Sequence, residues 1–271
     1  MKTLSNIQIS PVLRFYLDNH TGKLYPYGPD FGLEQQEQFW QEQLAEGGLG
    51  GLTSVKKGSE LVLTRDISDI QLAALLRWFL WRWYGEEEDI LATIDWEAAL
   101  KNQGYPASFD GGVILAVDEQ IIVAPQCCVG LQDHTEWFNE SLSKKFQRIW
   151  IGHPWIYLKQ QRDQVLLTGL IEKEMHGERW LHYESADNDY LLDYSKFRAK
   201  AKEQLDEHDL KYQISLTEWT RAIKGLEAEL QDFKARIIAY LMPIIPAYAQ
   251  KIAQCLVEGN GEALSYDPKD I

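Results

Sequence analysis

The stretch GVILAVDEQIIVA, residues 112–124, gives the clearest indication of the fold. Two apolar, β-branched runs, 112–117 and 120–124, are separated by the polar pair Asp118-Glu119, a gap of hairpin length. Further short candidate strands follow, with polar turns between them, at 148–151, 155–160, 164–170 and 179–184. Consecutive strands with such short gaps favour antiparallel pairing, because a parallel neighbour needs a long crossover connection. We therefore expect an antiparallel sheet of about five or six strands.

Helical patterns flank this β-rich centre. Ahead of the C-terminal region, helices are predicted over four stretches: 33–45, 68–84, 87–101 and 194–207. Ser68-Asp-Ile-Gln71 has the form of a capping box, and Asp133-His-Thr-Glu136 has the same form and predicts a short helix to about residue 145. The proline- and glycine-rich residues 1–33 are expected to form an irregular arm with one short strand near 13–17.

The C-terminal region carries the most regular pattern. A third capping box, Ser215-Leu-Thr-Glu218, precedes apolar residues at alternating steps of four and three: Trp219, Ile223, Leu226, Leu230, Phe233 and Ile237. This heptad seam predicts a long helix that ends or kinks at Pro243. The seam suits packing along the chain's own helices or a homodimer contact. Its length of about three heptads, the lower limit for a stable coiled coil, favours the first.

These elements predict an α+β fold in which helices pack on one face of the sheet and a long helix lies at the C-terminus. The composition, 45% hydrophobic and 25% charged over 271 residues, is typical of a globular chain that buries its own core. We expect one domain over residues 1–271. Its parts are an N-terminal arm with helices (1–110), a central sheet region (111–210) and a C-terminal helical segment (214–258).

Charge and cysteine content limit the partners and the compartment. The net charge of −14 repels nucleic acid, and no Lys/Arg cluster is large enough to overcome that repulsion. The most apolar segment, 72–84, is too short and too charged to span a bilayer, which needs ~20 apolar residues, so no membrane contact is expected. The start of the chain does not have the pattern of a secretory signal. Three cysteines, two of them adjacent, suit a reducing cytoplasm.

The sequence shows no catalytic or cofactor motif in the context that such a motif needs. The glycine-rich stretch 47–51 follows a helix, whereas a phosphate loop precedes one. Cys127 and Cys128 are adjacent and point apart on an extended backbone, which does not suit zinc. His153, between a glycine and a proline and close to Trp155, suits a structural turn or a general base. We expect no catalytic residue, no metal and no cofactor.

Three segments between residues 125 and 157 have a recognisable form: Pro125-Gln-Cys-Cys128, Asp133-His-Thr-Glu-Trp137 and Trp150-Ile-Gly-His-Pro-Trp155-Ile-Tyr157. Over residues 112–210 the chain resembles a group of uncharacterised bacterial proteins, similar in kind to the SUKH-like immunity proteins of polymorphic toxin systems. Val129 departs from the pattern, which prefers glycine there. The resemblance implies a mixed sheet-and-helix fold, no catalysis and a role in gripping a protein. It implies these binding residues: Cys127, Cys128, Trp137, His153, Pro154 and Trp155.

We therefore predict a non-enzymatic, cytoplasmic binding protein. The hypothesis is an immunity protein that neutralises a bacterial toxin, or holds another protein partner, through an acidic and aromatic surface. A net charge of −14 suits a basic toxin domain, because opposite charge speeds association. Two alternatives stay open: an enzyme of unknown class with a site around His153, and a structural protein that oligomerises through the heptad seam.

Overall fold

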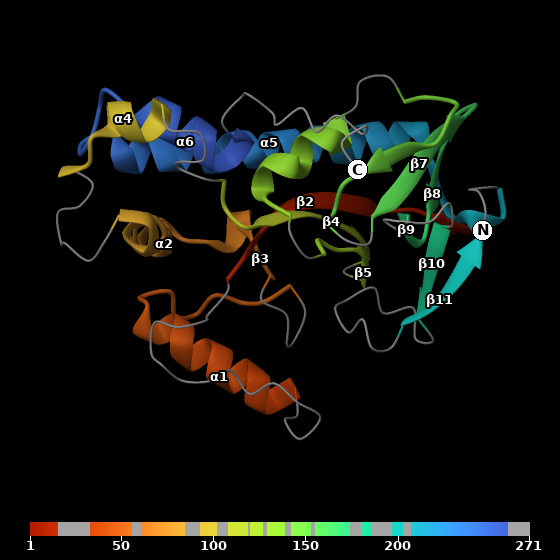
Figure 1. The fold of residues 1–271 in the computed structure, drawn as a ribbon, viewed down its shortest axis with the longest axis horizontal. Helices are drawn as coiled ribbons and strands as arrows, with labels where there is room; N and C mark the ends of the chain where they lie inside the picture. The colour runs from red at the N-terminus through yellow and green to blue at the C-terminus, as the bar shows by residue number, and fades with distance from the viewer. Residues whose placement is uncertain are drawn as a thin grey trace. The chain divides into compact units, whose positions relative to one another are not determined.

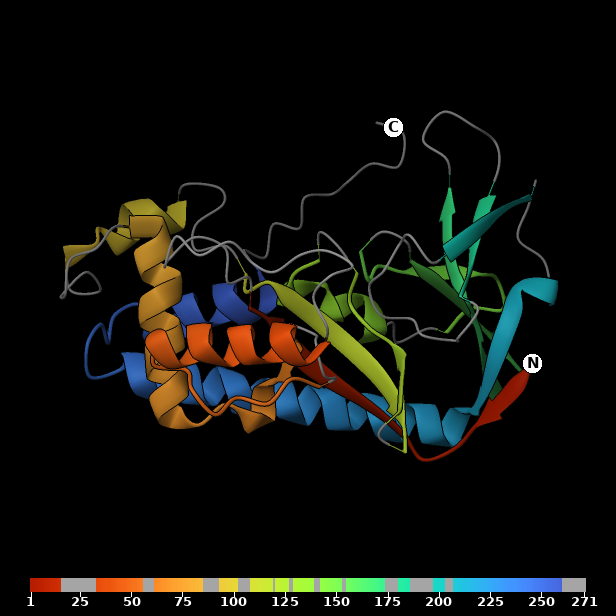
Figure 2. The same cartoon turned by 90° about the horizontal axis from the view of Figure 1, so that it is seen from below.

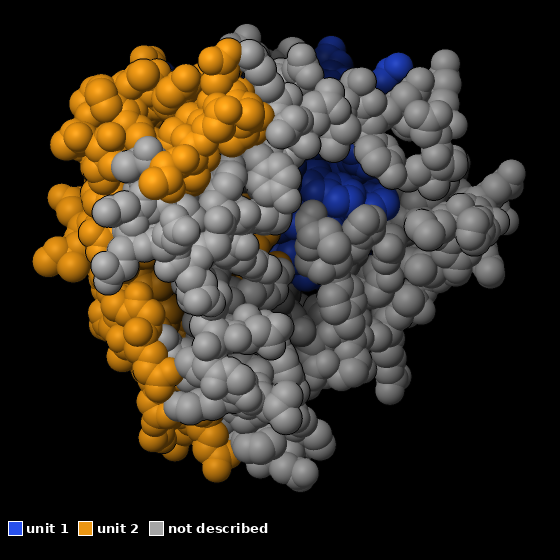
Figure 3. All heavy atoms as spheres, turned by 60° about the vertical axis from the view of Figure 1, so that its left-hand side comes forward, with its two compact units in different colours: residues 1–11, 112–228, 264–271 blue, residues 12–111, 229–263 orange. Residues whose placement is uncertain are grey.

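The structure, a computed structural model, describes most of the chain in separate stretches (Figure 1). These are residues 1–15, 33–55, 61–84, 93–101, 108–118, 120–126, 129–138, 142–152, 155–173, 180–185, 197–202 and 207–259. The chain divides into two compact units, coloured in Figure 3: residues 1–11, 112–228 and 264–271 form one, and 12–111 and 229–263 form the other. The prediction of a single domain stays a prediction.

The first unit contains a five-stranded sheet in the order β1-β12-β8-β7-β6. Its strands are β1 (Lys2–Leu4), β6 (Gln147–Ile149), β7 (Ile156–Gln161), β8 (Gln164–Thr168) and β12 (Leu210–Ser215). Neighbouring strands are antiparallel except β1 and β12, which are parallel. The prediction of a purely antiparallel sheet, preceded by an irregular arm, is therefore wrong. Short gaps constrain only consecutive strands, whereas β1 and β12 are about two hundred residues apart in the chain.

A three-stranded antiparallel sheet in the order β11-β10-β9 follows in the same unit. Its strands are β9 (Leu170–Lys173), β10 (Trp180–Ser185) and β11 (Phe197–Lys202). Strand β11 lies where a helix was expected over 194–207, so that prediction is wrong. The sequence FRAKAK alternates apolar and charged residues with a period of two, which suits a strand. Pairing with β10 outweighs the high helix propensity of Ala and Lys.

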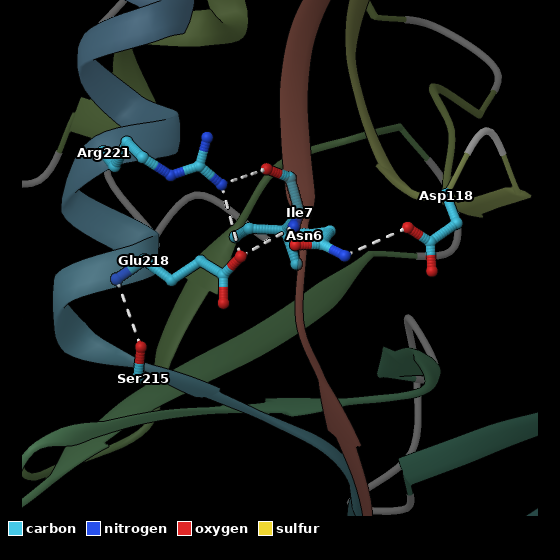
Figure 4. Close-up of polar contacts among 6 residues, drawn as sticks. All are labelled: Asn6, Ile7, Asp118, Ser215, Glu218 and Arg221. Carbon is cyan, nitrogen blue, oxygen red and sulfur yellow. Dashed lines mark hydrogen bonds and ion pairs between the residues drawn. The ribbon is translucent and has the colours of Figure 1, made fainter.

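The predicted hairpin is confirmed as β4 (Gly111–Val117) and β5 (Gln120–Val123), which pair antiparallel. They belong to a four-stranded sheet of order β3-β2-β4-β5, together with β2 (Ile7–Arg14) and β3 (Leu61–Leu63). Asp118 follows β4 with a left-handed φ of 47°, a conformation that Asp tolerates in turns. Its Oδ1 accepts a hydrogen bond of 3.3 Å from Nδ2 of Asn6, which is also left-handed at 54° (Figure 4).

The helices confirm the mixed α and β composition. They are α1 (Leu33–Glu46), α2 (Asp69–Tyr84), α4 (Trp96–Lys101), α5 (Leu216–Leu241) and α6 (Ala249–Glu258). The capping box before α2 is complete: the Gln71 N–H donates to Ser68 Oγ (3.3 Å), and the Ser68 N–H donates to Gln71 Oε1 (2.9 Å).

Helix α5 is the long C-terminal helix that the heptad seam predicts, and it is drawn in blue in Figure 2. It ends two residues before Pro243, as the missing N–H of proline requires. Five seam side chains are no more than 3% exposed within this single chain: Trp219, Leu226, Leu230, Phe233 and Ile237. The sixth, Ile223, is half-buried. The seam therefore packs within the chain, the arrangement that the sequence analysis favours over a dimer contact.

The start of α5 fixes the connection between β1 and β2 through the backbone of Ile7 (Figure 4). Ser215 Oγ accepts the N–H of Glu218 (3.2 Å), which is half of the predicted capping box. The Glu218 carboxylate, however, accepts the N–H of Ile7 (3.1 Å). Arg221 Nη2 donates both to the Ile7 carbonyl (3.1 Å) and to Glu218 Oε1 (3.2 Å). Both backbone polar groups of Ile7, a residue only 1% exposed, are thus paired with α5.

We predict that Glu218→Ala lowers the free energy of unfolding by about 1–3 kcal/mol, because it leaves the Ile7 N–H buried without an acceptor. Urea denaturation measures this loss. Glu227→Ala, which removes an exposed carboxylate from the same helix, should stay within about 0.5 kcal/mol of the wild type. Equal effects of the two substitutions would contradict the role given to Glu218.

Candidate functional site

The candidate site lies in the first unit, where the 3-10 helix η2 (Leu131–Phe138) precedes the β6–β7 hairpin. The sequence predicts a short helix opened by a capping box at Asp133 and Glu136; a helix is present, but its predicted start and its capping are wrong. The helix begins at Leu131, so Asp133 already lies inside it, and its carboxylate accepts the Gly130 N–H (2.8 Å). The Glu136 carboxylate instead accepts the backbone N–H of Trp150. The Glu136 carboxylate therefore bonds a backbone N–H that is distant in sequence, and not the nearby N–H of a capping box.

Strand β6 is the last strand of the five-stranded sheet and pairs with β7, so that Arg148 lies opposite Tyr157. The backbone that follows β6 forms hydrogen bonds with groups that do not belong to the sheet. Glu136 accepts the Trp150 N–H, and the N–H of Gln126 donates to the carbonyl of Ile151. These bonds satisfy backbone groups that would otherwise lie unpaired at the end of an outer strand.

Two indole rings and one guanidinium group meet beside this hairpin. The Trp150 and Trp155 rings stack with centroids 5.8 Å apart and an interplanar angle of 28°. Arg148 Cζ lies 5.3 Å from the Trp150 centroid and 5.6 Å from that of Trp155. Trp155 is 8% exposed, Trp150 is half-buried and Arg148 is exposed. We call these three residues the Arg148 platform. Cation–π attraction of about 0.5–1 kcal/mol at an exposed site helps to hold the guanidinium in place.

The guanidinium group of Arg148 contacts both of these rings. Within the described stretches, no carboxylate forms an ion pair or a hydrogen bond with it. Its positive charge still acts on Glu136 and Tyr157 at longer range. The platform therefore presents a positioned cation whose N–H donors are available to a ligand.

Burial changes the acidity of the neighbouring groups. It raises the pKa of Glu136 above its ordinary value of 4.5, and the charge of Asp133 adds to this effect. The Trp150 N–H and the charge of Arg148 lower the pKa of Glu136 by a smaller amount. Burial likewise raises the pKa of Asp133, although the hydrogen bond from the Gly130 N–H lowers it by a smaller amount. Burial also raises the pKa of Tyr157, although the Trp155 indole and the charge of Arg148 lower it by smaller amounts. Desolvation is the largest cause in each case.

The residues singled out from the sequence fall in different places. Trp155 belongs to the platform. Trp137 is 3% exposed and stacks on Trp219, with centroids 6.1 Å apart, so it lies in the core. Four others lie outside the described residues: Cys127, Cys128, His153 and Pro154. No group of three or more His, Cys, Asp or Glu that could hold a metal ion occurs in the part of the chain that the structure describes.

Sequence reasoning missed Arg148, Trp150, Glu136 and Tyr157. One signal could have found the first pair: they stand two residues apart in an extended run, so their side chains share a face. Glu136 comes to Trp150 across fourteen residues, and no local pattern indicates that contact.

Comparison with known proteins adds no family to this geometry: no protein-family model, curated protein or solved structure matches the chain. None of the helices in the described stretches has both the length and the apolar character needed to cross a membrane.

We predict that Glu136→Gln becomes more stable relative to the wild type as the pH rises from about 4 to 7. The pKa of Glu136 is higher in the folded chain, so its contribution to stability is full below pH 4.5 and is lost as the pH rises through the folded pKa. Gln has no such loss, and its oxygen can still accept the Trp150 N–H. Urea denaturation across this pH range measures the difference.

The exposed Glu227→Gln is the control, because it removes the same charge outside the site. A Glu136→Gln variant whose relative stability stayed constant with pH, or fell as the pH rose, would show that burial does not disfavour the ionised carboxylate.

Proposed function

We propose that this chain is a non-enzymatic binding protein that grips a protein partner through the Arg148 platform. The observation that carries the proposal is the exposed guanidinium stacked against Trp150 and Trp155. Arg and Trp are enriched among the residues that dominate binding energy at protein interfaces. Because the rings already restrict Arg148, less side-chain entropy is lost when a partner binds.

The resemblance to toxin-immunity proteins suggests the partner, and we propose a basic toxin domain of a bacterial system. The net charge of −14 supports this choice, since it would steer a basic protein toward the chain. The three cysteines, two of them adjacent, fit a reducing cytoplasm as the place of action. A homodimer through the heptad seam is not part of the proposal, because the seam side chains are already buried.

An enzyme is the second candidate, and one observation favours it. Glu136 and Asp133 are half-buried carboxylates with raised pKa values, Glu136 also feels the charge of the exposed Arg148, and such groups cluster at catalytic sites. An acid with a raised pKa suits general acid catalysis. Glu136→Gln separates the two candidates, because it would abolish turnover and leave protein binding largely intact.

We predict that the platform supplies the main contact with the partner. A tagged chain expressed in its native host would capture the partner, and calorimetry with both purified proteins would measure affinity. Arg148→Ala and Trp150→Ala should each weaken binding at least tenfold, as expected for hot-spot residues. Lys144→Ala and Lys145→Ala, which remove exposed cations just before β6, should change it by about twofold or less.

Two results would contradict the proposal: the absence of a specific protein partner, and a partner that binds all four variants equally well. Thermal unfolding of each variant shows whether a loss of binding reflects the platform or a loss of fold.

A further inference from the structure

The chemistry of the platform indicates which chemical group of a partner it binds. A guanidinium group has five N–H donors in one plane, arranged to fit the two oxygens of a carboxylate. The contact of Arg148 with the two indoles uses its charge and its surface, whereas its donors pair with no acid in the described stretches. We infer that Arg148 forms a bidentate pair with an aspartate or glutamate side chain of the partner. This inference rests on the proposed binding function.

A carboxylate fits the surroundings better than a phosphate. Arg148 lies close enough to Glu136 for its charge to act on that carboxyl, and Asp133 acts on the same group. For a dianion the opposition of these two acids and the attraction of Arg148 both double, because Coulomb energy is proportional to charge, so the second charge of a phosphate brings no relative gain at a single cation. Phosphate recognition in proteins relies on clusters of arginines, whereas the platform contains one.

A side-chain carboxylate also fits better than the C-terminus of a partner. Capture of a terminal carboxylate uses a nest of backbone N–H groups. Here the backbone N–H of Trp150 already donates to Glu136, and the N–H of Gln126 already donates to Ile151. The fork of N–H donors on the Arg148 side chain, by contrast, pairs with no acid in the described stretches.

The overall charge further specifies the partner. At −14 the chain repels an acidic segment at long range. The residue that Arg148 takes is therefore a single Asp or Glu within an otherwise basic surface. The basic surroundings draw the two proteins together, and the one acid forms the local contact.

Titration of the full-length chain with three capped peptides tests this inference. Each peptide carries four lysines around a central Glu, Gln or phosphoserine, and NMR follows Arg148 Nε–H and the indole N–H signals of Trp150 and Trp155. We expect the Glu peptide to shift these signals saturably and to bind at least tenfold more tightly than the Gln peptide. Arg148→Lys, which keeps the charge but loses the fork, should remove most of that preference.

Equal binding of the Glu and Gln peptides, or no saturable shift with either, would overturn the inference. Tighter binding of the phosphoserine peptide would also overturn it, in favour of a phosphate site. The comparison of peptides needs no variant, so a variant that fails to fold does not weaken it. If the peptides show no preference but Trp150→Ala still loses the partner, the carboxylate inference fails alone. If the Glu peptide is preferred but the partner binds every platform variant as tightly as the wild type, the proposed function is wrong and the carboxylate inference stands.

Discussion

The carboxylate of Glu136 accepts the backbone N–H of Trp150, and the geometry of the candidate site depends on this bond. Trp150 follows β6, which is the outer strand of its sheet in the part of the chain that the structure describes. An N–H group in a half-buried position needs an acceptor, and Glu136 supplies one. With its backbone fixed there, the Trp150 ring lies against Trp155, and Arg148 lies over both. Burial of the carboxylate opposes its ionisation, which is why the pKa of Glu136 is raised.

Charge acts on two scales in this molecule. The sum over the chain is −14, so the field at a distance is negative and attracts basic proteins. At the platform, however, the exposed cation Arg148 lies over two indole rings, and its charge acts on Glu136, a carboxyl group that burial makes harder to ionise. At long range the chain therefore attracts a positively charged partner, whereas at the platform Arg148 attracts a negatively charged group on that partner. An interface of this kind gains rate from the first and specificity from the second.

Local patterns predicted the elements that local forces determine. The hairpin of β4 and β5, helix α2 and helix α5 all follow from residue periodicity and turn chemistry. The three capping boxes show the limit of such patterns. Ser68 and Gln71 pair reciprocally, but Glu218 accepts Ile7 from the first strands, and Glu136 accepts Trp150 from beyond β6. In the last two cases a long-range backbone donor competed successfully for the carboxylate.

The parts that the sequence did not predict depend on pairings between distant segments. Strand β1 reads as an irregular arm until β12 lies beside it, and FRAKAK reads as helix until β10 supplies its ladder. The same holds for the candidate site. Trp155 stands out in the sequence because of its motif, whereas Arg148 is important because β6 folds back on β7 and places it near that ring.

The side-chain protons of Arg148 test the central claim most directly. A guanidinium group that lies over two indole rings experiences their ring currents, so the NMR signals of the Arg148 side chain should be shifted upfield from ordinary arginine positions. Glu136→Ala should move them back toward those positions, because it frees the backbone of Trp150, whereas Glu136→Gln should leave them in place. Arg148 signals at ordinary positions in the wild-type chain would contradict the platform and the binding role that is built on it.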